Sequence, residues 1–184
     1  TQQYEEYLSL LQTYDENDFI STTEGDTFEL DPFKEDWAQI GWYRWWAFEE
    51  NISEFVFKAQ FKWSTASETP DESGCGFVFG IHENGDHYSV LLDKSRILFL
   101  MKRGTYNYLV GKTRGSGRAD FGNPAEAEFI LAVKGRSAYV SVDCEVTEYT
   151  LSADQTSAGD FGPTLLSGTN SGNGTRCEMT DIMI

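Results

Sequence analysis

Apolar and polar residues alternate along most of the chain. In residues Ile52–Trp63, apolar side chains occupy one face and polar side chains the other, with Val56 as the exception. Alternation at period two is the pattern of a strand with one buried side and one solvent-facing side. The apolar face comprises Phe55, Phe57, Ala59, Phe61 and Trp63, and the polar face comprises Glu54, Lys58, Gln60 and Lys62.

Further short strands are expected at regular spacing, separated by Gly-, Asn-, Asp- and Pro-containing turns. This spacing, without strand–helix alternation, predicts an antiparallel sandwich or barrel and excludes a parallel α/β sheet. Asp143 and Cys144 are expected to form a tight hairpin turn. The expected strands are Cys75–Ile81, His87–Asp93, Arg96–Lys102, Tyr106–Lys112, Ala127–Val133, Ala138–Val142, Glu145–Leu151, Gly162–Ser167 and Arg176–Ile184.

One helix is predicted, near the N-terminus. Between residues 4 and 14, Tyr4, Tyr7, Leu8 and Leu11 follow the i, i+3, i+4, i+7 spacing of an amphipathic helix. We therefore divide the chain into an N-terminal helix and acidic leader, residues 1–24, and a β-sandwich, residues 25–184.

Charge narrows the choice of partners. The 184 residues carry a formal net charge of −16, and residues 1–50 hold thirteen acids and two bases, a charge of −11. Nucleic acids and anionic membrane surfaces are disfavoured, because both are bound by clustered Lys and Arg. No apolar run approaches the ~18 residues that would span a bilayer. The acidic leader is expected to be a solvated surface, with a cation-binding surface as the alternative.

The order of the strand motifs resembles that of a known superfamily. An acidic, Trp-rich segment precedes Phe55-Val56-Phe57-Lys58-Ala59-Gln60-Phe61, followed by Gly74-Cys75-Gly76-Phe77-Val78-Phe79 and His87-Tyr88-Ser89-Val90. A hairpin then rises through residues 129–135, and residues 177–182 form the closing strand. Over residues 25–184 this order resembles the concanavalin A-like lectin/glucanase superfamily, and within it the bacterial laminin G-like and sugar-hydrolase-associated domains.

The resemblance implies an all-β, antiparallel, two-sheet jelly-roll sandwich with a short N-terminal helix. It also implies a bacterial, extracytoplasmic protein, secreted or attached to the cell surface. We expect a non-catalytic binding domain for carbohydrate. The alternatives are a protein-interaction or adhesion module without a small ligand and a degenerate glycoside hydrolase. Because the chain begins at Thr1, we expect that an export signal has been removed.

Catalytic motifs are weak. Laminarinase-type glucanases of this superfamily carry Glu-x-Asp-x-x-Glu on a strand of the concave sheet, and Glu24-Gly25-Asp26-Thr27-Phe28-Glu29 has these letters. However, Gly25 and Thr27 replace apolar residues, and Glu24 lies in an expected turn. Without a Gly-x-Ser-x-Gly motif, a Ser-His-Asp hydrolase is also disfavoured. We therefore expect no catalytic residues.

Metal ligands and cofactors are not expected either. The two histidines, His82 and His87, flank a polar turn, where exposed imidazoles are a simpler explanation than a metal site. Calcium is possible but unassigned, because no run has the ligand spacing of an EF-hand. Candidate ligands are Asp15-Glu16-Asn17-Asp18 and Asp71-Glu72.

Aromatic residues are the main candidates for sugar binding, because flat rings stack on the apolar faces of sugars. On a strand, Trp42 and Trp46 share one face, while Tyr43 and Trp45 share the other. One face would then fill the core and the other reach the surface. Tyr106 and Tyr108 form a second pair, for which a cross-strand aromatic ladder is the alternative.

Three cysteines permit three single bridges or three reduced thiols. In an architecture like that of the similar superfamily, strands near the start of the sandwich lie close to the closing strand. This placement implies a Cys75–Cys177 disulfide, with Cys144 left over. Such a bond favours an exported protein.

Overall fold

The computed structural model describes residues 1–66, 73–93, 97–110 and 123–184. Within these ranges the chain forms two seven-stranded antiparallel sheets and one helix. Sheet A has the order β1-β14-β5-β10-β11-β12, with β2 also paired to β14. Sheet B has the order β3-β13-β6-β7-β8-β9, with β4 also paired to β13. The calcium candidates Asp71 and Glu72 lie outside the described residues. So do Arg96, which begins one expected strand, and residues 111–112, which end another.

The elements have the following bounds: α1 Gln2–Glu16, β1 Glu29–Leu30, β2 Phe33–Trp37, β3 Trp42–Trp45, β4 Phe48–Ile52, β5 Phe55–Thr65, β6 Gly74–Ile81, β7 His87–Leu92, β8 Ile97–Arg103, β9 Tyr106–Leu109, β10 Ala125–Lys134, β11 Ser137–Val142, β12 Glu145–Thr150, β13 Gly159–Ser167 and β14 Thr175–Met183.

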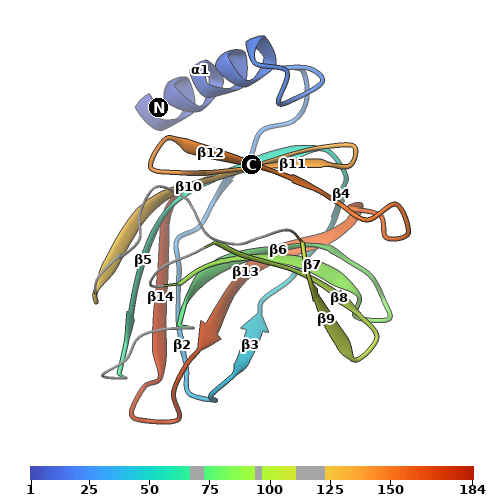
Figure 1. Ribbon diagram of the computed structural model, residues 1–184. Coiled ribbons are helices and arrows are strands. Elements are labelled where there is room, and N and C mark those ends of the chain that lie inside the picture. The colour runs from blue at the N-terminus through green and yellow to red at the C-terminus, as the bar shows by residue number, and fades with distance from the viewer. Residues whose placement is uncertain (67–72, 94–96, 111–122) are drawn as a thin grey trace.

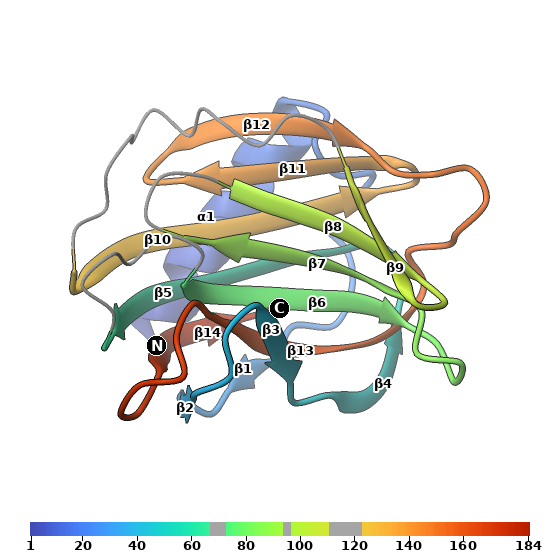
Figure 2. The same cartoon turned by 60° about the horizontal axis from the view of Figure 1, so that its bottom comes forward.

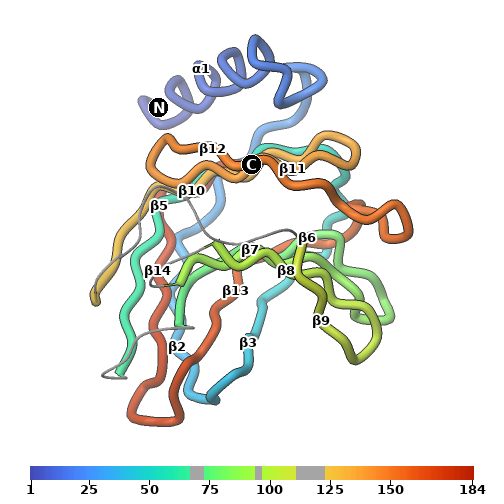
Figure 3. Tube along the Cα trace, in the orientation of Figure 1, coloured from blue at the N-terminus to red at the C-terminus, as the bar shows by residue number. Residues whose placement is uncertain are grey.

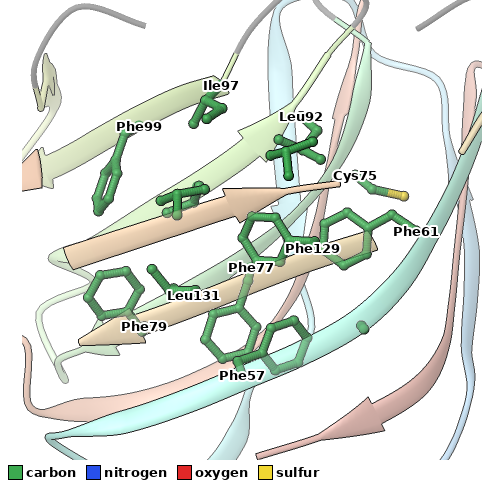
Figure 4. Close-up of a cluster of buried hydrophobic side chains, with 14 of the residues drawn as sticks. Phe57, Phe61, Cys75, Phe77, Phe79, Leu92, Ile97, Phe99, Phe129 and Leu131 are labelled. Atoms are coloured by element: carbon green, nitrogen blue, oxygen red, sulfur yellow. The ribbon is translucent and has the colours of Figure 1, made fainter. Parts of the chain in front are cut away.

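The two sheets pack face to face, and this arrangement is the antiparallel jelly-roll sandwich that the sequence predicted (Figure 1). Their inner faces enclose an aromatic core. Phe57 of sheet A stacks on Phe77 of sheet B with the ring centroids 4.0 Å apart, and Phe61 stacks on Phe129 at 4.6 Å (Figure 4). The alternation in residues 52–63 therefore identified a core-facing strand.

Helix α1 covers part of the outer face of sheet A, on the side away from sheet B (Figure 3). This explains why Val56 interrupts the polar face of β5: it is buried against the helix, and its carbonyl accepts a hydrogen bond from the Tyr7 hydroxyl at 2.6 Å. The helix was predicted, but the prediction of which of its faces packs against the sheet was partly wrong. Tyr7 and Tyr14 are buried, whereas Tyr4 and Leu8 are exposed.

Strands β1, β2 and β4 were not predicted. They lie between residues 29 and 52, in the acidic, Trp-rich segment that precedes β5, and most of their side chains are exposed. In β2 only the terminal Phe33 and Trp37 are partly buried, and the three residues between them are charged and exposed. Strands at the margins of a sheet bury little, so their sequences do not show the alternation of a core strand.

A tight turn and a disulfide connect strands of the sandwich. Asp143 and Cys144 form the expected two-residue turn between β11 and β12, and both have positive φ angles, 48° and 71°. Cys75 of β6 is joined to Cys177 of β14 by a disulfide with a Cα–Cα distance of 5.3 Å, so the bond links the two sheets. Cys144 is a free, exposed thiol.

Candidate functional site: an aromatic and polar cluster on sheet B

The outer face of sheet B carries side chains that do not reach the core. Along β7, Tyr88, Val90 and Leu92 point into the core, so His87, Ser89 and Leu91 point to the outer face. Figures 1 and 2 show sheet B as curved, with β3 and β9 turned away from sheet A. Apolar side chains on this outer face form a small cluster of their own, comprising Leu91, Leu98 and Leu166 with the partly buried Tyr43 and Leu100.

Strand β3 adds two aromatic rings to this face. The β3 register with β13 pairs Tyr43 with Leu166 and Trp45 with Thr164, so both rings lie on the same side of the sheet. Their centroids are 5.7 Å apart, and each ring contacts the imidazole of His87, at 5.7 Å from Tyr43 and 4.6 Å from Trp45. Both rings are half-buried, so each keeps part of its surface available to solvent.

Hydrogen bonds fix the orientation of this cluster. His87 Nδ1 lies 2.8 Å from the Gly85 carbonyl, which can only accept, so Nδ1 carries the ring proton. The other nitrogen, Nε2, then accepts the hydrogen bond from the Tyr43 hydroxyl, also at 2.8 Å. The side-chain amide of Asn107 lies 3.3 Å from the same hydroxyl and reaches it from β9. The cluster thus combines two half-exposed rings with fixed polar groups.

Burial keeps this hydrogen-bonded pair uncharged. It raises the pKa of Tyr43 to about 12, against a smaller lowering by the Ser89 hydroxyl. It also lowers the pKa of His87 to about 4, with a further lowering by the Lys102 charge and opposing effects of the Gly85 carbonyl and Asp86. At neutral pH the pair is therefore a phenol and a neutral imidazole.

The predicted aromatic residues are not all in this cluster. Tyr43 and Trp45 lie together in it. Trp42 faces the other side of β3 and is 63% exposed. Trp46 lies beyond the end of β3 and packs against the core beside Phe33, while the Arg44 guanidinium lies 5.2 Å from its ring.

Tyr106 and Tyr108 also lie outside the cluster. They share one face of β9, with ring centroids 6.4 Å apart, and are exposed. Asn107, between them in sequence, faces the other side and reaches Tyr43. The predicted pair thus stands next to the cluster without contributing to it.

Sequence reasoning missed His87 and Asn107. The expectation that both histidines are exposed was wrong: His87 is fully buried, and His82 is partly buried, with Nε2 3.0 Å from the Ala158 carbonyl. Alternation along β7 could have indicated the face of His87, because His87 shares a strand face with Ser89 and Leu91. Nothing in the sequence indicated that a side chain from β3 would cover it.

The residues with the glucanase-like spacing lie outside the cluster on sheet B. Glu24 and Asp26 lie in the segment that precedes β1, and Glu29 begins β1 at the margin of sheet A. None is in sheet B.

In the described ranges, no group of three or more His, Cys, Asp or Glu side chains is arranged to hold a metal ion. No helix in these ranges is both long and apolar enough to cross a membrane.

Acid should destabilise the protein through His87. An unfolded histidine binds a proton near pH 6.5, whereas the folded one resists it until about pH 4. The unfolded state therefore binds more protons in this window, and stability present above about pH 6.5 is lost as the pH falls towards 4. The loss should approach about 3 kcal/mol.

Urea unfolding at several pH values measures this effect, with His87→Gln as the comparison, because glutamine does not titrate. We expect a flatter pH dependence between about pH 6.5 and 4 for the variant. Equal slopes for the two proteins would contradict the assignment of a neutral, buried His87.

Comparison with known proteins places the fold. No protein-family model matches the sequence, and no curated protein matches it. Solved structures do match. Carbohydrate-binding module CBM66 from Bacillus subtilis aligns with a TM-score of 0.58 at 10% identity, covering 83% of this chain and 91% of that module.

Two enzymes with the same fold also align. A Bacillus licheniformis β-glucanase gives a TM-score of 0.53 at 9% identity, covering 73% of this chain and 66% of the enzyme. Alginate lyase A1-II′, of polysaccharide lyase family 7, gives 0.50 at 10% identity, covering 72% and 61%. At these identities the likeness shows the fold alone. The chain has a concanavalin A-like jelly-roll sandwich fold, as the resemblance in sequence implied.

Proposed function

We propose that this protein is a non-catalytic, extracytoplasmic carbohydrate-binding domain and that the outer face of sheet B binds the sugar. The observation that carries the proposal is the pair of half-buried rings, Tyr43 and Trp45, held beside His87 and Asn107. Aromatic faces stack on the apolar faces of pyranose rings, and fixed polar groups orient the hydroxyls.

The preorganisation of the rings supports this role. Tyr43 is held at both ends, through the backbone pairing of β3 with β13 and through its hydroxyl contacts with His87 and Asn107. A ring that is already fixed loses little conformational freedom when a ligand stacks on it. The similarity in fold to a carbohydrate-binding module, a glucanase and an alginate lyase favours carbohydrate as the ligand class.

The ionisation of the cluster supports binding without catalysis. A Tyr–His pair could act in proton transfer if one member ionised near neutral pH. Burial shifts both pKa values away from neutrality, that of Tyr43 upward to about 12 and that of His87 downward to about 4. Such a pair keeps its proton on the Tyr43 oxygen, and this hydroxyl donates a hydrogen bond to the imidazole of His87.

The disulfide supports an extracytoplasmic location. Cys75 and Cys177 are both fully buried and link the two sheets. Disulfides of this structural kind form and persist in oxidising compartments. A location outside the cytoplasm would also place the domain where polysaccharides occur.

Exposed apolar residues favour protein interaction as the second candidate function. Trp42 is 63% exposed, and at the opposite margin of sheet B Tyr106 and Leu109 are 68% and 63% exposed. Large exposed apolar side chains are typical of protein–protein contact regions. Trp42 and Tyr106 project from the opposite sides of β3 and β9 to Tyr43 and Asn107, so neither belongs to the ordered polar and aromatic cluster.

A glycan-array screen of the purified domain tests the proposal, followed by titration of the best glycan into two variants. Trp45→Ala removes a ring of the cluster and should lower affinity at least about tenfold. Trp42→Ala removes a more exposed ring from the other side of β3 and should leave affinity nearly unchanged. All titrations are made well below the unfolding midpoint of each variant.

Binding of no glycan on the array would reject the proposal and favour the protein-interaction alternative. Equal loss of affinity in the two variants, or a loss only in Trp42→Ala, would place the sugar site elsewhere on the molecule.

A further inference from the structure

A second potential binding site lies between the acidic leader and the sandwich, away from the outer face of sheet B. It is a partly open cavity of about 480 Å³, lined mainly by residues 20–28 and residues 50–56. This volume is within the range of small-molecule sites, ~300–1,000 Å³. None of its lining residues belongs to the Tyr43–Trp45 cluster, so the inference does not rest on the proposed function.

Part of the cavity lining is apolar and buried. Phe55, Val133, Phe161 and Ile184 line it, and all four are buried. Phe28 also lines it and remains 49% exposed, although the backbone of Phe28 is fixed by two hydrogen bonds to Ile184, at 2.8 and 3.0 Å. A ligand that fills this cavity must therefore present an apolar face.

The polar part of the lining is acidic. Glu24, Asp26, Glu50 and Glu54 line the cavity, and its lining includes no Lys, Arg or His. The Glu54 carboxylate accepts a hydrogen bond from the Gly135 backbone N–H at 3.0 Å. Across the described part of the chain, the other three carboxylates have neither an ion pair nor a side-chain hydrogen bond. They are therefore available to a ligand.

Electrostatics then determines the class of ligand. Carboxylates beside an apolar, low-dielectric wall focus a negative potential, which attracts cations and repels anions. The charge of −11 on residues 1–50, which include most of the lining, strengthens this potential. Hydroxyl groups of Ser21, Thr22 and Thr23 add further hydrogen-bonding groups at the same wall.

We propose that this cavity binds a small organic cation, a protonated amine carried on a body with an apolar face. The amine would pair with the carboxylates of Glu24, Asp26 and Glu50, and the apolar face would contact Phe28 and Phe55. Amino sugars and aliphatic polyamines share this chemistry, whereas uronic acids and other anions are excluded by charge.

Isothermal titration at about pH 6 and low salt tests the proposal, since both amines and carboxylates are then charged. The probes are the glucosamine trimer, its neutral N-acetylated counterpart and spermidine. We expect saturable binding of at least one amine probe, and at least about tenfold weaker binding of the acetylated trimer. The amine probe that binds more tightly identifies the class of the cation, an amino sugar or a polyamine.

A charge-matched pair of variants locates the binding. Glu24→Gln/Asp26→Asn should weaken amine binding at least about tenfold. Glu5→Gln/Asp15→Asn changes the net charge equally but alters exposed residues of α1 that do not line the cavity, and it should leave affinity within about twofold. Trp45→Ala should leave amine binding unchanged, and Glu24→Gln/Asp26→Asn should leave neutral-glycan binding unchanged.

Absence of amine binding would overturn the proposal. Equal weakening by the two double variants would assign the binding to general surface charge, and loss in Trp45→Ala would place it on sheet B. In Trp45→Ala, in which the proposed sugar site on sheet B is disabled, binding of the acetylated trimer as tightly as the amine would show that charge does not select the ligand. Each of these results contradicts a cation site in this cavity, and none depends on whether sheet B binds sugar.

Discussion

Phe57→Ala is expected to lower the free energy of unfolding by about 3–5 kcal/mol. Phe57 is 2% exposed and joins the two sheets through its stacked contact with Phe77 at 4.0 Å, and it also contacts Phe61 and Phe129. Truncation removes apolar contact area and leaves a cavity that the surrounding rings of both sheets can fill only partly.

Urea unfolding measures this loss, with Tyr106→Ala as the control. Tyr106 is an aromatic residue of similar size but is 68% exposed, so its truncation should change stability by less than about 1 kcal/mol. Similar losses for the two variants would contradict the aromatic core between the sheets.

Removing the disulfide is expected to have a comparable effect. The Cys75–Cys177 bond joins residues 102 apart in sequence. In the chain-entropy model, opening a loop of this length costs up to about 4.7 kcal/mol, because the unfolded chain regains conformational freedom. The double variant Cys75→Ala/Cys177→Ala should therefore unfold at a much lower urea concentration than the oxidised wild type.

Cys144→Ala is the matched control, because Cys144 is exposed and forms no disulfide. It should change stability by no more than about 0.5 kcal/mol. If the unfolding free energies of the oxidised wild type and the double variant lay within about 1 kcal/mol of each other, the bond would not stabilise the sandwich.

The core of the fold could be predicted from sequence because core strands carry a repeating signal. The alternation through Phe55, Phe57 and Phe61 follows from a face that is buried and a face that is not. Strands β1, β2 and β4 lack this signal. Strand β2 carries three consecutive exposed charged residues, so only its pairing with β14, which sequence does not show, makes it a strand.

The candidate site could be predicted only in part. Alternation placed Tyr43 and Trp45 on one face of a strand, and the structure has them on one face of sheet B. Their partners His87 and Asn107 come from strands far away in the chain, so their meeting depends on the curvature of sheet B. The cavity beside the leader likewise depends on where residues 20–28 lie relative to residues 50–56.

The most direct test of sugar binding on sheet B is a nuclear magnetic resonance titration that follows the indole N–H signals of the five tryptophans. The probe is the glycan that binds most tightly on the array, and Trp45→Phe assigns the signal of Trp45. We expect that signal to shift progressively and reach saturation, while the signal of Trp63, which is 4% exposed in the core, stays in place. A saturating glycan that shifts other indole signals and leaves that of Trp45 unchanged would contradict the proposed site.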